Sequence, residues 1–181
     1  LRSLVGSEMC IRDSRGIKSV MTIHNLKFQG VYDIKTVQNI TGLDNSYFTP
    51  DKLAYYKDGN LLKGGLTYAD AITTVSQTYA EEIKTDFYGE HLNGLLNARS
   101  KDLRGIVNGI DYNEYNPQTD QYIIRKYNAD NFRKEKIKNK RDLQKQLGLE
   151  ENDKKMMIGI VSRLTDQKGM DLVAYIMDEL C

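Results

Sequence analysis

The sequence predicts an α/β fold with parallel sheets of the doubly wound kind. Short apolar, β-branched segments alternate along the chain with segments of helical periodicity. Two of the apolar segments end in short polar turns, His24-Asn25 and Asn108-Gly109. Because strands that alternate with helices pack most readily as parallel sheets covered by helices, this pattern favours the doubly wound class.

The first half of the chain supplies two predicted strands and two helical regions. Residues 17–23 are apolar and end at the polar turn, which is typical of a buried strand. Apolar residues in 51–69 recur near helical spacing, and helices are predicted there. Residues 71–76 are short and β-branched and predict a second strand, whose Ser76 is expected to cap a helix over 77–85.

The second half repeats the alternation of strands and helices. Residues 102–110 predict a strand, and the irregular polar segment with Pro117 that follows is interpreted as a crossing or hinge. A helix is predicted over 131–147, ended by Gly148, a residue preferred directly after helices. The last predicted strand is 156–161, and an amphipathic helix is predicted over 170–180.

Composition and charge exclude several classes of protein. The 26 basic and 25 acidic residues give a net charge of +1, so no overall field favours nucleic acid or an anionic membrane. No apolar run approaches the ~20 residues that a membrane span needs. Cys10 and Cys181 lie at opposite ends and, with His24 and His91, match no metal-ligand spacing. We therefore expect no metal and a cytoplasmic location.

Residues 1–14 show no periodicity that continues into the rest of the chain. They resemble a translated adaptor sequence and are expected to be a non-native leader. A signal peptide is the alternative, but the apolar stretch is short and is followed by charged residues.

Arg163 and Lys168 follow the last predicted strand and precede the last predicted helix. In open α/β sheets ligands bind at the carboxyl ends of strands, and the start of a helix favours an anion. The forked guanidinium of arginine and the compact charge of lysine would together suit a diphosphate. The alternative is that both are solvated loop cations.

His24 and Asn25 end the first predicted strand. Imidazole and carboxamide groups can hydrogen-bond sugar hydroxyls, and histidine can also move a proton near neutral pH. The alternative is a surface histidine at a capped strand end. Gly64-Gly65 could admit a ligand but could equally serve packing, and Asn108-Gly109 could be only a turn.

The basic run at 132–141 raises the alternative of nucleic-acid binding. It is rich in lysine, contains one aromatic residue and belongs to no recognised nucleic-acid module, so a solvated helix face is predicted instead. The sequence also lacks a P-loop and a G-x-G-x-x-G motif. No nucleic-acid partner and no membrane partner are expected, and no oligomeric state is indicated.

Several stretches together resemble the family of bacterial glycogen synthases and plant starch synthases. They are 22–30 (TIHNLKFQG), 62–66 (LKGGL) with 68–70 (YAD), 73–76 (TTVS), 107–111 (VNGID) and 162–169 (SRLTDQKG). Their order and spacing also match. The resemblance implies the GT-B architecture, which has two Rossmann-like domains with the active site in the cleft between them, each only partly present here.

The resemblance implies a division of the chain and an activity. Residues 15–107 would be the latter part of the amino-terminal starch synthase catalytic domain, 108–154 the hinge and linking helix, and 155–181 the start of the nucleotide-sugar-binding domain. The reaction implied is transfer of glucose from ADP-glucose to the non-reducing end of an α-1,4-glucan such as glycogen, with retention. Neither a metal nor a cofactor is implied, and this fragment alone is expected to be inactive.

The resemblance also implies roles for the candidate residues. Arg163 and Lys168 would bind the diphosphate and stabilise the charge on the departing ADP. His24 and Asn25 would hold the transferred glucose, and Asn108 would contact the donor from the hinge. His24, Arg163 and Lys168 are therefore the predicted catalytic residues.

Two departures and two alternatives accompany the resemblance. Gln77 stands where the family commonly has proline, and His91 where glycine is common in Y-G-x-G-L. The alternatives are another retaining GT-B glycosyltransferase with a different sugar nucleotide, and a non-catalytic glucan-binding relic.

Overall fold

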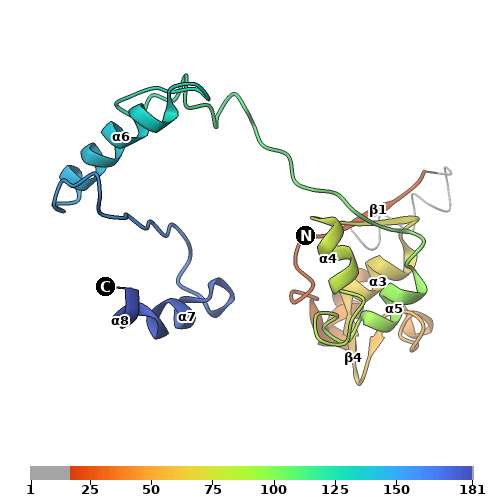
Figure 1. Ribbon diagram of the computed structural model, residues 1–181. Coiled ribbons are helices and arrows are strands. Elements are labelled where there is room, and N and C mark those ends of the chain that lie inside the picture. The colour runs from red at the N-terminus through yellow and green to blue at the C-terminus, as the bar shows by residue number, and fades with distance from the viewer. Residues whose placement is uncertain (1–16, 181) are drawn as a thin grey trace. The chain divides into compact units, whose positions relative to one another are not determined.

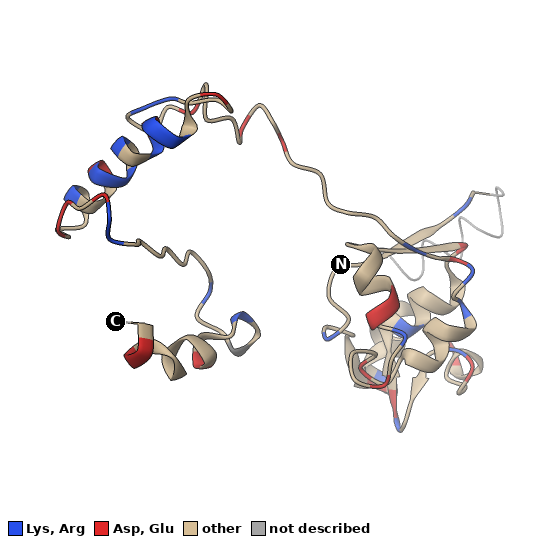
Figure 2. Ribbon diagram, viewed as in Figure 1, with Lys and Arg blue, Asp and Glu red and all other residues tan. Residues whose placement is uncertain are grey.

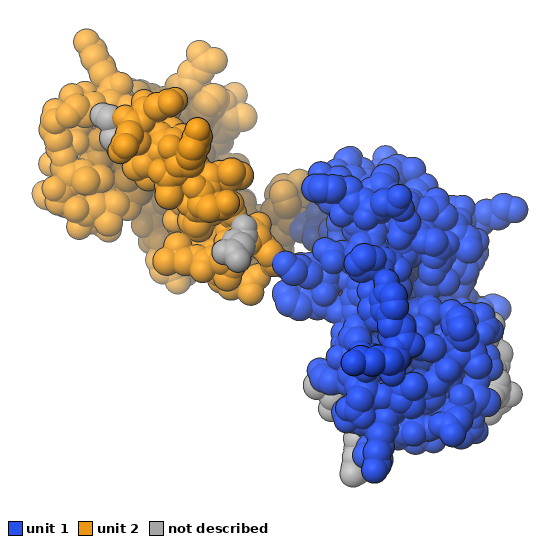
Figure 3. Space-filling model, turned by 90° about the horizontal axis from the view of Figure 1, so that it is seen from below, with its two compact units in different colours: residues 1–109 blue, residues 110–181 orange. Residues whose placement is uncertain are grey.

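The computed structural model describes residues 17–180, which belong to two compact units, residues 1–109 and residues 110–181 (Figures 1 and 3). All strands of the described chain lie in the first unit. The predicted leader, 1–14, falls outside the described residues. The predicted domain limits at 107, 108 and 154 stay predictions.

A parallel sheet of three strands forms the centre of the first unit. The strands are β1 (Val20–Ile23), β5 (Ala71–Thr74) and β6 (Leu103–Gly105), in the order β1-β5-β6. Ile23 pairs with Thr74, and Thr74 pairs with Gly105. The three strands predicted in this part are confirmed. Each is shorter than predicted, because the four residues of the central strand limit how far its neighbours can pair.

Helices pack on this sheet and bury one apolar core. They are α3 (Leu61–Tyr68), α4 (Gln77–Glu82) and α5 (Asn93–Ala98). The core contains Ile23, Leu26, Leu66, Ile72, Ala80, Ile83, Leu92, Leu96 and Leu103. The predicted cap of α4 is confirmed, since the Ser76 hydroxyl accepts a hydrogen bond from the Tyr79 N–H at 2.9 Å.

A second, antiparallel sheet lies in the same unit and corrects the prediction for 51–69. It consists of β2 (Val31–Asp33), β3 (Ala54–Tyr55) and β4 (Asp58–Asn60), in the order β2-β4-β3. The predicted helices are therefore wrong for 54–60 and right only for α3. The helical spacing of apolar residues that predicted these helices included Tyr56. In the structure Tyr56 is 82% exposed and has a φ of 54° in the turn between β3 and β4, so it is not part of a buried helix face. Two further helices, α2 (Ile34–Thr41) and the 3-10 helix η1 (Asn45–Tyr47), were not predicted.

Arg99, directly after α5, bonds both to the end of α3 and to Asp102, the residue before β6. Its guanidinium donates to the carbonyl oxygens of Leu66 at 2.8 Å, Thr67 at 3.1 Å and Ala69 at 2.7 Å. Its Nε also pairs with Asp102 at 2.6 Å. One half-buried side chain thus satisfies three backbone acceptors at the end of α3.

The second unit contains a long helix, α6 (Phe132–Gln146), and the short helices η2 (Asp166–Lys168), α7 (Met170–Tyr175) and α8 (Met177–Leu180). The predicted helix over 131–147 is confirmed, and Gly148 follows it with the left-handed φ of 67° expected of a helix-ending glycine. The predicted helix over 170–180 is interrupted at Ile176. Its apolar stripe is largely exposed, so tertiary packing does not hold the two halves in one helix.

The predicted strand over 156–161 is wrong for this structure. These residues have no regular structure, and the apolar side chains of Ile158, Ile160 and Val161 are exposed. A strand needs a hydrogen-bonded neighbour, and residues 110–180, all described, contain no strand that could pair with it.

Lys and Arg residues recur along most of α6 (Figure 2). Lys138 pairs with Glu135 at 2.9 Å, and Arg141 pairs with Asp153. Ion pairs of this kind are what a solvated face contains. That no nucleic acid binds there stays a prediction.

Acid is expected to destabilise the first unit through Asp70. Its carboxylate accepts hydrogen bonds from the Ser19 N–H at 2.9 Å and from Lys18 Nζ at 3.0 Å. The Ser19 backbone bond and the Lys18 bond lower the pKa of Asp70 to about 2. A depressed pKa in the folded state stabilises the fold above the ordinary carboxyl pKa of 3.8, and this contribution disappears as the pH falls through about 2.

The measurement is the urea midpoint of the wild type and of Asp70→Asn between pH 7 and pH 2. The variant should be the less stable at pH 7, and the difference should shrink between about pH 4 and pH 2. A difference that stays constant over this range would contradict the linkage.

Candidate functional site

Three of the five predicted site residues lie at one edge of the parallel sheet. His24 and Asn25 directly follow β1, and Asn108 follows β6 by three residues. Because β1, β5 and β6 are parallel and Ile23, Thr74 and Gly105 are in register, their carboxyl ends meet at the same edge. This is the edge at which open α/β sheets bind ligands.

The turn that carries His24 and Asn25 is fixed by its own hydrogen bonds. The Asn25 side-chain oxygen accepts from the Lys27 N–H at 3.0 Å, and the Asn25 carbonyl accepts from the Phe28 N–H at 3.3 Å. Leu26 is buried in the core and donates its N–H to the Tyr79 hydroxyl at 3.1 Å. A sugar contact from Asn25 would therefore use its NH₂ group, since its oxygen already serves the turn.

Tyr79 was missed by the sequence analysis as a positioning residue. It connects α4 to the turn after β1 and thereby holds His24 at the edge of the sheet. A weak signal was present, because Leu26 is a lone apolar residue in a polar turn and had to be buried against something.

Arg163 and Lys168 lie in the second unit. Three of the five predicted site residues therefore belong to the first unit and two to the second. Both side chains are exposed. Successive turns shape the loop: the Thr165 N–H donates to the Arg163 carbonyl at 3.0 Å, and the Lys168 N–H donates to the Thr165 carbonyl at 2.9 Å. Lys168 ends η2, and Gly169, with a φ of 65°, leads into α7.

Lys63-Gly64-Gly65 serves packing in this structure. A Cβ on Gly64 would lie 2.8 Å from the Leu53 side chain, and one on Gly65 would lie 3.2 Å from Met21. Lys63 Nζ donates to the carbonyls of Pro50 and Ala54, both at 2.6 Å, and burial lowers the pKa of this lysine. These contacts hold α3 between β1 on the Gly65 side and the segment 50–54 on the other, and they favour the packing interpretation of the two glycines.

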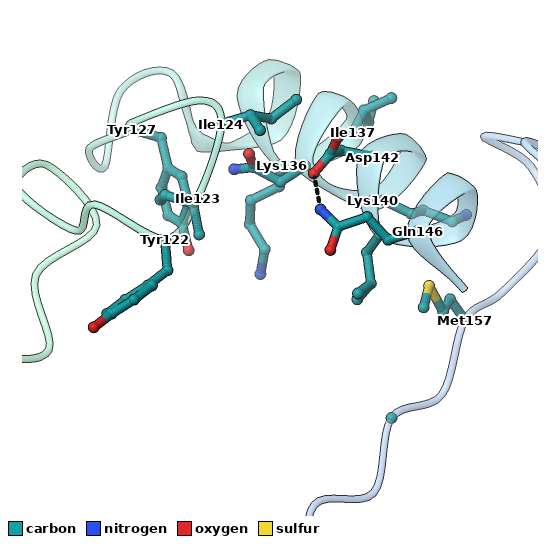
Figure 4. Close-up of a pocket in the computed structure, with 13 residues that line it drawn as sticks. Tyr122, Ile123, Ile124, Tyr127, Lys136, Ile137, Lys140, Asp142, Gln146 and Met157 are labelled. Carbon is teal, nitrogen blue, oxygen red and sulfur yellow. Dashed lines mark hydrogen bonds between the residues drawn. The ribbon is translucent and has the colours of Figure 1, made fainter. Parts of the chain in front are cut away.

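The second unit contains a cavity of about 570 Å³ between the segment 122–127, α6 and Met157 (Figure 4). Tyr122, Ile123, Ile124 and Tyr127 are among its lining residues, as are side chains of α6, where Gln146 donates to Asp142 at 2.6 Å. The five predicted site residues, all of them described, are not among its lining residues.

Within residues 17–180, no helix combines the length and the apolar character that crossing a membrane requires. The same residues contain no cluster of three or more His, Cys, Asp or Glu side chains that could hold a metal ion.

The parallel sheet with polar residues at its carboxyl edge places the chain among the open α/β proteins, which bind ligands at that edge. The family model for the starch synthase catalytic domain matches residues 8–98. The chain belongs to the starch synthase catalytic domain family, as its motifs predict.

The sequence identity of the chain to individual named proteins supports this family assignment. The chain is 68% identical to a glycogen synthase of Lachnospira eligens and 64% identical to one of Lachnoclostridium phytofermentans. Each match covers 92% of this chain and 35% of the other protein, so the chain spans about a third of the length of these relatives.

A solved structure supports the fold. The catalytic domain of starch synthase IV from Arabidopsis thaliana, bound to ADP and acarbose, matches with a TM-score of 0.83 and 34% identity over 90% of this chain and 34% of that chain. The α/β class of the GT-B type predicted for this chain is thereby confirmed.

Proposed function

We propose that the protein carrying this chain is a glycogen synthase, which transfers glucose from ADP-glucose to the non-reducing end of an α-1,4-glucan with retention at the anomeric carbon. The observation that carries the proposal is the 68% identity, over 92% of the chain, to a protein named glycogen synthase. The ADP and acarbose bound to the Arabidopsis relative support an adenine nucleotide and a glucan-like ligand.

The geometry of the chain is compatible with this reaction. His24, Asn25 and Asn108 lie at the ligand-binding edge of the first unit, where they would hold the transferred glucose and contact the donor. Arg163 and Lys168 are exposed cations of one short loop and would bind the diphosphate. Their positive charge would stabilise the negative charge that develops on the leaving ADP. A cytoplasmic location and a reaction without metal or cofactor stay predictions.

The test is a chimera of the Lachnospira eligens glycogen synthase in which this chain replaces the matching segment of 167 residues. The chimera should transfer labelled glucose from ADP-glucose to glycogen. Transfer from UDP-glucose alone would favour a glycosyltransferase with a different donor. A folded chimera that uses neither donor would favour a glucan-binding relic.

The controls are the unaltered relative and the 181-residue chain alone. The chain alone is expected to be inactive, because it spans only 35% of the length of its relatives. Turnover of ADP-glucose by the chain alone would contradict this expectation.

A further inference from the structure

A cavity of about 540 Å³ lies beside the turn that carries His24 and Asn25. Its lining begins at Lys27, two residues after Asn25, and includes side chains from β2, β3 and the turn before α5. The lining includes the side chains of Lys27, Phe28, Tyr32, Tyr55, Glu90 and His91.

Three aromatic side chains, Phe28, Tyr32 and Tyr55, belong to this lining. Phe28 is 68% exposed, Tyr32 is half exposed and Tyr55 is half buried. Neighbouring aromatic rings that remain exposed around a concave site commonly mark a ligand surface. The C–H faces of a glucose ring can pack on such rings, while tyrosine hydroxyls can hydrogen-bond its hydroxyls.

Buried polar groups fix the two sides of the cavity to each other. Gln29 is buried and donates from Nε2 to the Glu90 carbonyl at 2.8 Å. Its Oε1 accepts from Nδ2 of the fully buried Asn60 at 2.6 Å, and Oδ1 of Asn60 caps α3 through the Lys63 N–H. The segment with Phe28 is thus held against the turn with Glu90 before any ligand binds, which lowers the entropic cost of binding.

Glu90 and His91 both have left-handed backbone conformations, with φ values of 45° and 63°. A non-glycine residue in this region costs roughly 1–2 kcal/mol. The strain persists because Leu92 is anchored in the core and its N–H donates to the Gly89 carbonyl at 2.6 Å. Such strain commonly occurs at ligand sites.

The backbone at His91 has a conformation that favours glycine. Glycine, which the family commonly has at this position, would adopt the same φ without strain. The histidine side chain is exposed and lines the cavity, so its contribution is to the cavity and not to the core.

Charge indicates the class of ligand. Lys27 and Glu90 bring one positive and one negative charge to the described lining, and no cluster of cations is present there to bind a phosphate. Aromatic faces combined with uncharged and mixed polar groups suit a neutral, polyhydroxylated molecule better than a nucleotide.

We propose that this cavity binds a segment of an α-1,4-glucan chain, with glucose rings stacked on Phe28 and Tyr32 and sugar hydroxyls hydrogen-bonded to Glu90 and His91. The inference rests on the proposed function, which supplies the glucan, and locates a binding surface for it next to His24. The cavity would guide the glucan toward the edge of the sheet.

The experiment is affinity electrophoresis of the 181-residue chain in gels that contain glycogen. Glycogen should retard the wild type, and Phe28→Ala should raise the apparent Kd roughly tenfold through loss of the stacking surface. Phe87→Ala is the matched control, because Phe87 is 84% exposed in the same unit and does not line the cavity. Circular dichroism checks that both variants fold.

A second variant, His91→Gly, tests whether the His91 side chain contributes to glycogen binding separately from its effect on the stability of the fold. Removing the left-handed strain should raise the Tm, while removing the side chain should weaken glycogen binding. A raised Tm with unchanged binding would overturn the role of His91 in the cavity.

The outcomes distinguish this inference from the proposed function. A wild type that glycogen does not retard, or a Phe28→Ala variant retarded like the wild type, would overturn the cavity as a glucan site, even if the chimera transfers glucose. Conversely, retardation that Phe28→Ala abolishes supports the cavity even if the chimera transfers none.

Discussion

Replacing Lys168 with alanine in the chimera is expected to lower kcat/KM for ADP-glucose roughly ten- to hundredfold. A charge-assisted hydrogen bond contributes about 1.5–3 kcal/mol, and every ~1.4 kcal/mol corresponds to a factor of ten in rate. If the charge also stabilises the departing phosphate, kcat itself should fall at saturating ADP-glucose. Steady-state kinetics with varied ADP-glucose measures both constants.

Lys138→Ala is the control for this prediction. Lys138 belongs to the same unit and pairs with Glu135 on α6, so its loss removes only a surface ion pair, which contributes little in water, and should leave turnover unchanged. A Lys168→Ala chimera within about threefold of the unmutated chimera would favour the alternative, in which Arg163 and Lys168 are solvated loop cations.

Gly105→Ala is expected to destabilise the first unit by about 3 kcal/mol, at the upper end of the cost of overpacking a core. A Cβ at this position would lie 2.2 Å from the Ser76 carbonyl oxygen and 2.4 Å from the Gln77 Cα. Both obstructing atoms belong to the backbone where β5 leads into α4, so no side-chain rotation relieves the clash. Urea unfolding of the 181-residue chain, followed by circular dichroism, measures the loss.

Gly94→Ala provides the matched comparison. Gly94 lies in α5, and a Cβ there would meet no atom within 4 Å. Alanine is favoured over glycine in a helix by up to about 1 kcal/mol, so this variant should be slightly more stable than the wild type. Equal stability of the two alanine variants would show that β6 and α4 can separate without cost.

The parallel sheet could be predicted because each of its strands is indicated by a pattern within a few consecutive residues. Each of the segments 17–23, 71–76 and 102–110 is apolar and ends in a polar turn or a capping residue, and each contains a strand. The motif residues could also be placed at strand ends, because the carboxyl edge of a parallel sheet follows from chain direction alone.

Elements that depend on tertiary partners could not be predicted from local patterns. Residues 54–60 have helical spacing but pair as strands, because β4 lies between β2 and β3 and Tyr56 turns away from the core. Residues 156–161 have the composition of a strand and form none, because pairing depends on a neighbour that local sequence does not specify.

The cavity beside His24 was also beyond the sequence analysis. Gln29, Asn60 and Glu90 come from three separate parts of the chain, and nothing in their local sequence indicates that Gln29 accepts a hydrogen bond from Asn60 and donates one to the Glu90 carbonyl. The departure at His91 was visible, but its meaning depends on the left-handed backbone that the fold imposes.

The contacts of Arg99 imply that α3 forms late when the chain folds. α3 has only eight residues, two of them glycine, and no basic residue in its last turn. A helix so short and so rich in glycine is unstable in isolation, and the cation that offsets its carboxyl-terminal dipole comes from a residue 30 positions beyond Ala69. The helix therefore gains its terminal charge only when α5 docks, and a peptide of residues 58–70 should be unstructured in water.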